Sequence, residues 1–366
     1  MSGGAGDPRE RRLAKLRAAL RGANLDVMLV SSRANTRYLT GFSGSSSLLV
    51  VSQTETVLIS DFRYRAQARA ECGTIAQVEI EGTSLWTRLW SVLPKMDGVT
   101  TVGFESAHLL HVDYQRLVEA GVRWHWHATT NIIEELRQQK DATEMEHIRA
   151  AVAIAEQALG LTVPEIKAGL TELEVGARLE RRLRELGSEA HPFETIIASG
   201  ERSALPHAHC TGRELKSGDL LIVDFGAVSG GYCSDITRTF VIGRADSAHR
   251  EAYDIVREAN ATAASAVRAG MRGREADALA RDYIERRGLG AEFGHSLGHG
   301  IGLEVHEAPR LAKTVDTPLP VGSVITIEPG VYRDGWGGVR IEDDVHLPAT
   351  GPVVLTSFPR DLHELK

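Results

Sequence analysis

Two aspartates flank a predicted turn and together could bind a cation. Asp224 ends an apolar run and Asp235 lies in a β-rich run, while residues 229–231 (Ser-Gly-Gly) favour a tight hairpin turn between them. If the turn is centred on Ser229 and Gly230, the two aspartates face each other on neighbouring strands. Opposed carboxylates repel one another, but a divalent cation between them reverses that interaction because deprotonated carboxylates are its preferred ligands. A register slipped by one residue would instead leave two partly exposed aspartates with no shared role.

Three histidines, His295, His299 and His306, lie within twelve positions in the segment 295–307 (HSLGHGIGLEVHE). Such a cluster is typical of a metal or catalytic site. The glycines of this segment disfavour a regular helix and admit close approach of the backbone, so this is not the helical HExxH arrangement. The alternative is that each histidine is an ordinary core or surface residue.

Two glutamates lie at the ends of strand-like runs. Glu328 follows alternating apolar residues and precedes Pro329-Gly330, which predicts a position at a strand end facing a cleft. Glu342 lies two residues after Arg340, so the two side chains share one strand face. The alternative is a surface arginine–glutamate pair that contributes little to stability.

Taken together, these residues have the chemistry of a metal site. Two aspartates, two glutamates and one histidine supply four negative charges, which balance two divalent cations. Oxygen-rich ligation with a single imidazole suits Mn²⁺, Zn²⁺ or Co²⁺ better than a thiolate-rich zinc site. Two such ions about 3.5–4 Å apart can share a water, lower its pKa toward about 7 and hold the oxygen of the attacked group. The set therefore predicts metal-assisted hydrolysis.

The elements that must position these side chains fall into two regions. The first third alternates β-rich and helical runs and indicates a small α/β domain, residues 1–130. Its predicted strands are 26–32, 47–52, 56–61, 77–80 and 101–104, with helices beginning near Asp7, Phe62, Ser84 and Val112. The second region, residues 131–366, has predicted helices at 132–161, 171–186, 248–269 and 274–287 and strands at 220–225, 232–242, 324–328 and 339–343. Separate sets of helices and hairpins predict an α+β domain.

Length and composition agree with this division. A chain of 366 residues predicts about two domains, and 42% apolar with 25% charged residues is ordinary for a globular protein. The net charge of -7 gives no basic surplus for nucleic acid or anionic lipid. Cys72, Cys210 and Cys233 show no paired spacing, which favours a reducing cytoplasm. We expect no signal peptide and no membrane span, because no apolar run approaches about 18 residues.

Several motifs occur in the order seen in the "pita-bread" metallopeptidases. They are Leu205-Pro-His207, Asp224-Phe-Gly, Ser234-Asp-Ile-Thr-Arg238, the histidine segment 295–307, Ile327-Glu-Pro-Gly330 and Val339-Arg-Ile-Glu-Asp-Asp344. The chain most resembles the Xaa-Pro peptidases of that family, namely aminopeptidase P and the Xaa-Pro dipeptidases (prolidases). The resemblance covers residues 130–366 and implies a pita-bread catalytic domain there, while the N-terminal third resembles the creatinase-like N-terminal domain.

The resemblance implies a role for each matching residue. Five ligands would hold two metal ions: Asp224, Asp235, His299, Glu328 and Glu342. Asp235 and Glu342 would bind both ions. The histidines that would hold substrate and stabilise the tetrahedral intermediate are His207, His295 and His306. Arg340 would support the hydrogen-bond network of the site. The implied reaction is attack of a metal-bridging hydroxide on the Xaa-Pro carbonyl carbon, with Glu328 carrying a proton to the proline nitrogen. His209 lies outside the motifs, and we expect it at the surface or rim.

Several activities are compatible with this resemblance. Release of the first residue from short peptides with proline at the second position (Xaa-Pro aminopeptidase) ranks first. Prolidase follows closely, because Arg310 is a candidate to bind the proline carboxylate of a dipeptide. Methionine aminopeptidases share the ligands but usually lack a large N-terminal domain, so they rank third. A metal-free peptide- or protein-binding pseudoenzyme is the alternative from another class, although such relatives lose ligands that this chain retains. The resemblance also implies two divalent ions per subunit, Mn²⁺ foremost, and a homodimer.

Overall fold

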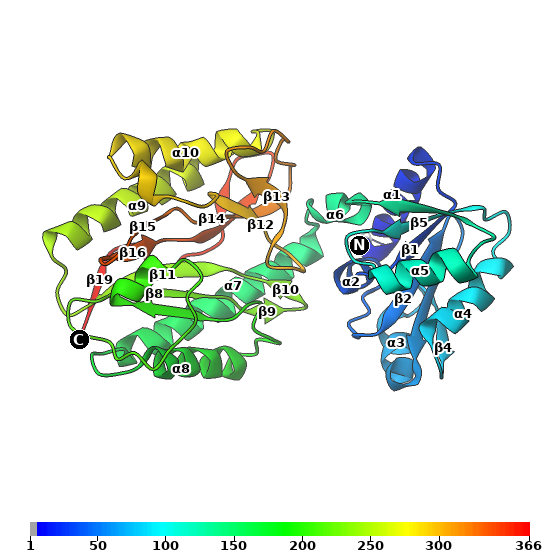
Figure 1. Ribbon diagram of the computed structural model, residues 1–366, viewed down its shortest axis with the longest axis horizontal. Helices are drawn as coiled ribbons and strands as arrows, with labels where there is room; N and C mark the ends of the chain where they lie inside the picture. The colour runs from blue at the N-terminus through cyan, green and yellow to red at the C-terminus, as the bar shows by residue number, and fades with distance from the viewer. Residues whose placement is uncertain (1–5) are drawn as a thin grey trace, which may run out of the picture. The chain divides into compact units, whose positions relative to one another are not determined.

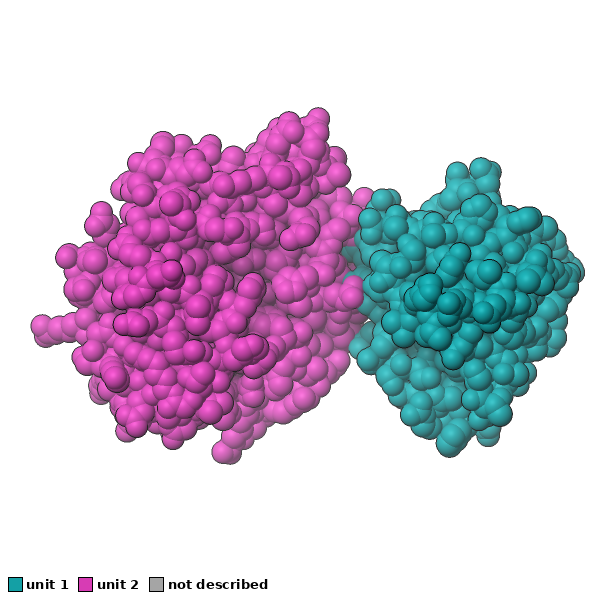
Figure 2. All heavy atoms as spheres, viewed as in Figure 1, with its two compact units in different colours: residues 1–137 teal, residues 138–366 magenta. Residues whose placement is uncertain are grey.

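The computed structural model describes residues 6–366 and divides the chain into two compact units, residues 1–137 and 138–366 (Figure 2). The stretch predicted as helical over 132–161 contains two helices, α6 (Ile132–Arg137) and α7 (Ala142–Thr162). A capping box begins α7: Glu144 N donates to the Asp141 carboxylate (3.1 Å), and Asp141 N donates to the Glu144 carboxylate (3.0 Å). The prediction of continuous helix is therefore wrong at residues 138–141.

The first unit contains a six-stranded sheet with strand order β4-β3-β2-β1-β5-β6. Its strands are β1 (Val27–Val30), β2 (Ser47–Ser52), β3 (Thr56–Asp61), β4 (Gln77–Glu81), β5 (Thr101–Glu105) and β6 (His125–Thr129). Its other helices are α1 (Pro8–Gly22), α2 (Arg33–Thr40), α3 (Arg65–Cys72), α4 (Leu85–Val92) and α5 (His111–Ala120). All five predicted strands are present. The sequence does not predict β6, since this edge strand is polar and has little buried surface.

The second unit has two main sheets, with strand orders β19-β11-β8-β7 and β13-β12-β14-β17-β18. The strands of the first are β7 (Ile196–Ser199), β8 (Leu220–Phe225), β11 (Ile236–Ile242) and β19 (His363–Leu365). Those of the second are β12 (Gly298–Gly300), β13 (Glu307–Leu311), β14 (Ser323–Ile327), β17 (Asp343–Leu347) and β18 (Val353–Val354). Two short hairpins pair β9 (Val228–Ser229) with β10 (Tyr232–Cys233) and β15 (Gly330–Arg333) with β16 (Gly337–Arg340).

Helices cover the outer sides of these sheets (Figure 1). In one hydrophobic core, α7 and α8 (Glu172–Glu185) pack with β8 and β11, as Leu179 and Val223 illustrate. In another, α9 (Ser247–Ala266) and α10 (Gly273–Arg286) pack with β14 and β17 through residues such as Val256 and Ile325. Each fully buried aliphatic side chain of this kind contributes roughly 1.5–3 kcal/mol. The predicted α+β class is confirmed, and helices bury the outer face of each main sheet.

Two expectations from composition can be compared with the structure. Cys72, Cys210 and Cys233 are all free thiols. Within residues 6–366, none of the helices combines the length and the apolar character needed to cross a membrane.

The capping box of α7 gives a stability prediction. Replacing Asp141 by Ala leaves the N–H of Glu144 without its cap, so we expect the free energy of unfolding to fall by about 1 kcal/mol. Urea unfolding followed by circular dichroism measures the change. Thr171→Ala removes the equivalent cap of α8 and is the matched comparison. An unchanged urea midpoint for Asp141→Ala would show that the cap contributes nothing.

Candidate metal centre

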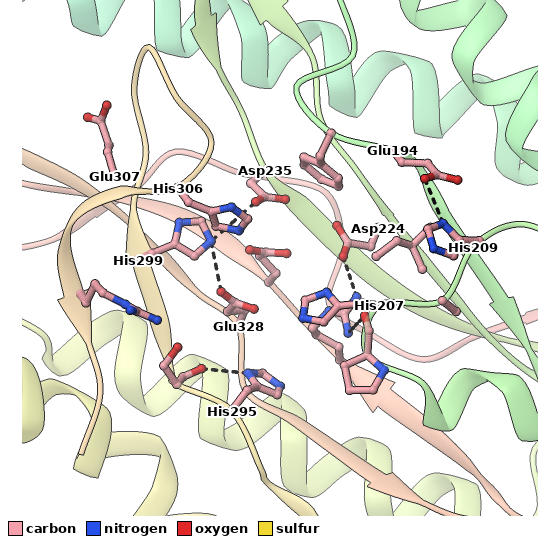
Figure 3. A pocket seen from close by; sticks show the side chains of 18 of the residues that line it. Glu194, His207, His209, Asp224, Asp235, His295, His299, His306, Glu307 and Glu328 are labelled. Carbon is pink, nitrogen blue, oxygen red and sulfur yellow. Dashed lines mark hydrogen bonds and ion pairs between the residues drawn. The ribbon is translucent and has the colours of Figure 1, made fainter. Parts of the chain in front are cut away.

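A cavity of about 930 Å³ in the second unit brings the predicted site residues together (Figure 3). Ten of them line it: His207, Asp224, Asp235, His295, His299, His306, Arg310, Glu328, Arg340 and Glu342. Phe193, Ile196 and Ala208 add an apolar part to the wall. His209 also lines the cavity; its side chain is 77% exposed and its Nδ1 lies 2.9 Å from Glu194 Oε2. A place at the rim is what the sequence predicts for it.

The hairpin that carries the two aspartates differs in register from the prediction. Its turn is formed by Gly230 and Gly231, which both have positive φ angles (57° and 81°), as a type I′ turn requires. Asp224 therefore pairs with Thr237, and the predicted direct pairing with Asp235 is wrong by two residues. Because side chains alternate between the faces of a strand, a shift of two keeps both aspartates on the same face.

The other candidate ligands come from the second sheet. His299 is the central residue of β12, which pairs with β14. Glu328 directly follows β14 and Glu342 directly precedes β17; these two strands pair antiparallel up to Ile327 and Asp343. The two glutamates thus lie at the same end of one ladder. His299 Nε2 is 3.3 Å from Glu328 Oε1.

The ligand atoms of this cluster are arranged as a cation would require. Asp235, His299 and Glu342 each offer one ligand atom, and all three atoms lie within 4.8 Å of one another. His299 Nδ1 is 3.0 Å from the Gly300 carbonyl oxygen, so it carries the proton and Nε2 is left for a metal. The buried oxygens Asp224 Oδ1 and Asp235 Oδ1 have no hydrogen-bond partner. Unsatisfied buried oxygens are costly, and hard divalent cations prefer such ligands, so the residues fit a divalent metal.

Burial and repulsion between like charges dominate the electrostatics of this cluster. Burial and then the neighbouring Glu342 raise the pKa of Asp235 well above its usual range. Burial and then Glu328 do the same to the pKa of Glu342. Burial raises the pKa of Glu328 to about 8, although Arg340 opposes the shift. Burial lowers the pKa of His299 to about 4. Without a cation, these raised pKa values favour protonated Asp235, Glu328 and Glu342 at neutral pH, whereas the His299 imidazole is already neutral.

A chain of hydrogen bonds connects Asp224 to His295. The Arg340 guanidinium donates to Asp224 Oδ2 (2.5 Å) and to the Tyr332 hydroxyl (2.7 Å). That hydroxyl is 3.1 Å from His295 Nε2, and His295 Nδ1 is 2.8 Å from the Ser296 carbonyl oxygen. Since a carbonyl only accepts, Nδ1 of His295 carries the proton and Tyr332 donates to Nε2. Arg340 thus lies between Asp224 and Tyr332 in this network.

Sequence reasoning missed two members of this network. Thr237 Oγ1 donates to Glu342 Oε2 (2.6 Å) and accepts from Arg340 Nε (3.2 Å). Its position two residues after Asp235 puts it on the same strand face, which could have revealed it. Tyr332 offered no such signal, because an aromatic residue in a short strand is most often simply part of the core.

Comparisons with known proteins agree with this geometry. Residues 146–349 match metallopeptidase family M24, and residues 12–139 match the creatinase/prolidase N-terminal domain. A curated Xaa-Pro dipeptidase from Pyrococcus furiosus is 36% identical over 96% of this chain and 99% of its own length. The solved Xaa-Pro dipeptidase from Bacillus anthracis has a TM-score of 0.94 and 38% identity, covering 98% of this chain and 100% of its own. The solved X-Pro aminopeptidase from Thermotoga maritima has a TM-score of 0.90 and 36% identity, covering 96% and 99%.

The fold and the carboxylate-rich cavity are those of a metal-dependent hydrolase. This chain belongs to metallopeptidase family M24, the pita-bread family that its motifs resemble. The creatinase-like identity of the first unit is likewise confirmed.

The raised pKa values of the carboxylates predict that metal binding releases protons. A metal binds the deprotonated groups, so it displaces protons that Asp235, Glu328 and Glu342 hold near neutral pH, and its apparent affinity should rise between pH 6 and 8. Each displaced proton corresponds to about a ten-fold gain per pH unit. His299 adds nothing in this range, because burial lowers its pKa to about 4.

Isothermal titration of Mn²⁺ into metal-free protein, in buffers with different ionisation enthalpies, measures this release. Glu328→Gln removes one of the displaced protons and should lower the number released. Affinity that stays constant or falls as the pH rises would contradict the expectation.

Proposed function

We propose that this metallopeptidase hydrolyses the Xaa-Pro bond of dipeptides. The observation that carries the proposal is Arg310, an exposed residue of β13 that pairs with His299 of β12 and lines the cavity. Within residues 6–366 no carboxylate forms an ion pair with its guanidinium. A guanidinium recognises a carboxylate with two parallel hydrogen bonds, and an Xaa-Pro dipeptide presents a carboxylate one residue from the scissile bond. The relatives named Xaa-Pro dipeptidase support the same substrate.

The chemistry requires the metal that the donor set fits. Asp224, Asp235, His299, Glu328 and Glu342 would hold two divalent ions, and we propose Mn²⁺, with Zn²⁺ and Co²⁺ as alternatives. When bound, such ions supply Lewis acidity toward the peptide carbonyl and an activated water.

The other residues of the cavity would bind the peptide and move its proton. Glu328, 3.3 Å from His299 Nε2, would carry the proton to the leaving proline nitrogen. His207 and His306 line the cavity and would contact the peptide. Burial lowers the pKa of His306, so at pH 7 its neutral ring can donate one hydrogen bond and accept another. Both ring nitrogens of His295 are already hydrogen-bonded, so we propose for it a supporting place beside Tyr332 in place of the substrate contact that the resemblance implies.

Release of the first residue from longer peptides is the second candidate, although the sequence ranks it first. The cavity of about 930 Å³ supports it, being near the upper end of the range of roughly 300–1,000 Å³ for small-molecule sites. The name of the Thermotoga maritima relative supports it too. We also propose a cytoplasmic location, which three free thiols favour. The homodimer that the resemblance implies is likewise part of the proposal.

Substrates of different length test this choice. With Mn²⁺ supplied, we expect Ala-Pro to be cleaved with a higher kcat/KM than Ala-Pro-Ala. Arg310→Gln should raise KM for Ala-Pro by about ten-fold or more, because a charge-assisted hydrogen bond is lost, and should affect Ala-Pro-Ala less.

The control for this test is Arg181→Gln. Arg181 is a 78% exposed arginine of α8 that does not line the cavity, and its substitution should leave both substrates unaffected. Faster cleavage of the tripeptide, with no effect of Arg310→Gln on the dipeptide, would favour the aminopeptidase instead.

Removing the charge of one ligand tests the proposed metal site. Glu342→Gln keeps the size of the side chain and an acceptor for Thr237, but it removes a carboxylate from the cluster. We expect bound metal to decrease and kcat/KM to fall by roughly a hundred-fold or more, with an unchanged circular dichroism spectrum. Glu292→Gln, outside the cavity, is the control. Full activity in Glu342→Gln would exclude the proposed site.

A further inference from the structure

The cavity wall is connected to a buried ion pair that lies outside the proposed ligands. Lys140 Nζ is 2.6 Å from Glu307 Oε1, and the two side chains are 0% and 5% exposed. Burying two charges is costly, and removing one partner leaves the other uncompensated. Neither residue is among the proposed ligands or substrate contacts, yet Glu307 lines the cavity.

Lys140 is bonded to β13 and to the residue directly before β14, the two strands that flank the strand of His299. Its backbone N–H donates to the Gly322 carbonyl oxygen (3.0 Å), directly before β14. Its ammonium reaches Glu307, the first residue of β13. In the sheet, β12 lies between β13 and β14. One residue therefore fixes the spacing of the two strands on either side of His299.

Glu307 in turn contacts the segment 301–306, which precedes it in the chain. Figure 3 shows its side chain extending away from His299 and Glu328. The carboxylate lies against Gly302, where a Cβ atom would come within 2.5 Å of Glu307 Oε1. The Glu307 side chain thus folds back onto the beginning of this segment. The last residue of the segment is His306. The ring centroids of His306 and His299 are 4.4 Å apart.

We propose that Lys140 is a positioning residue, which through Glu307 holds His306 at the place where the peptide binds. The proposal rests on the proposed function, because it gives His306 a contact with the peptide. Lys140 acts only through another side chain, so its effect should depend on the presence of His306. A side chain that merely stabilised the fold would act independently of His306.

A double-mutant cycle measures this dependence. Lys140→Met removes the ammonium while retaining much of the aliphatic volume, and it is combined with His306→Ala. The readouts are kcat and KM for Ala-Pro, bound metal by mass spectrometry and the thermal midpoint. We expect Lys140→Met to lower kcat/KM on the order of ten-fold in the wild-type background and by less than about three-fold in His306→Ala, with the metal content unchanged.

Two further variants make the cycle decisive. Arg213→Met breaks the partly buried ion pair with Asp219, away from the cavity, and should keep kcat/KM within about two-fold of wild type. Glu307→Gln removes the same ion pair from its other side and takes the place of Lys140→Met if that variant does not fold.

Four results would overturn the proposal, and they can be told apart. Independent effects of Lys140→Met and His306→Ala on kcat/KM would assign the ion pair to general stability. Loss of metal in Lys140→Met would mean that the pair acts through the ligands. An unaffected Lys140→Met would show that the pair positions nothing. Failure of the wild type to cleave Ala-Pro would overturn the proposed function together with this inference, whereas failure of the cycle alone would overturn only the inference.

Discussion

The catalytic unit is organised around four carboxylates that converge away from water. In a cavity this buried, their mutual repulsion adds to the cost of desolvation, and both effects raise the pKa values of Asp235 and Glu342. Arg340 offsets part of the negative charge through its contact with Asp224. Two oxygen atoms remain without any hydrogen-bond partner, and a bound cation is what would satisfy them. The geometry of the site and its fit to a divalent metal thus have the same electrostatic cause.

Such repulsion can be sustained only by a frame that does not relax. The candidate ligands come from two different sheets, at or directly beside strand ends, and helices on the outer sides bury the apolar faces of those sheets. A ligand on a strand is held by its ladder and cannot move away from its neighbours without breaking backbone hydrogen bonds. Thr237 adds a second constraint, since its hydroxyl bridges Arg340 and Glu342. Burial of the outer layers therefore maintains the unfavourable arrangement in the middle.

The residues of the site could be predicted because residue type and the alternation of side chains along a strand can both be read from short stretches of sequence. An aspartate that ends an apolar run and a glutamate before Pro329 are conspicuous in the sequence, and alternation fixes their faces even when the register is uncertain. The register itself was wrong by two, because the choice between Ser229-Gly230 and Gly230-Gly231 as the turn depends on φ angles. The break between α6 and α7 was missed although the sequence marks it: no apolar residue lies between Leu136 and Ala142, and Asp141 with Glu144 has the spacing of a capping box. Tyr332 acquires its role only from contacts across the fold, which no spacing encodes.

The distribution of charge in the cavity would also orient a bound peptide. Two divalent ions would balance the charge of the four carboxylates, so the charge that would orient a peptide carboxylate has to come from the cavity wall. Burial lowers the pKa values of His299 and His306, which makes these rings neutral at pH 7, and Arg310 on the paired strand adds a positive charge beside them. A dipeptide oriented by these groups, as we propose, would place its only peptide bond next to the carboxylates that would hold the metal. In a longer peptide the carboxylate lies further from that bond, so Arg310 would hold it less well. The distance between one arginine and the metal ligands would then decide which peptide length is preferred.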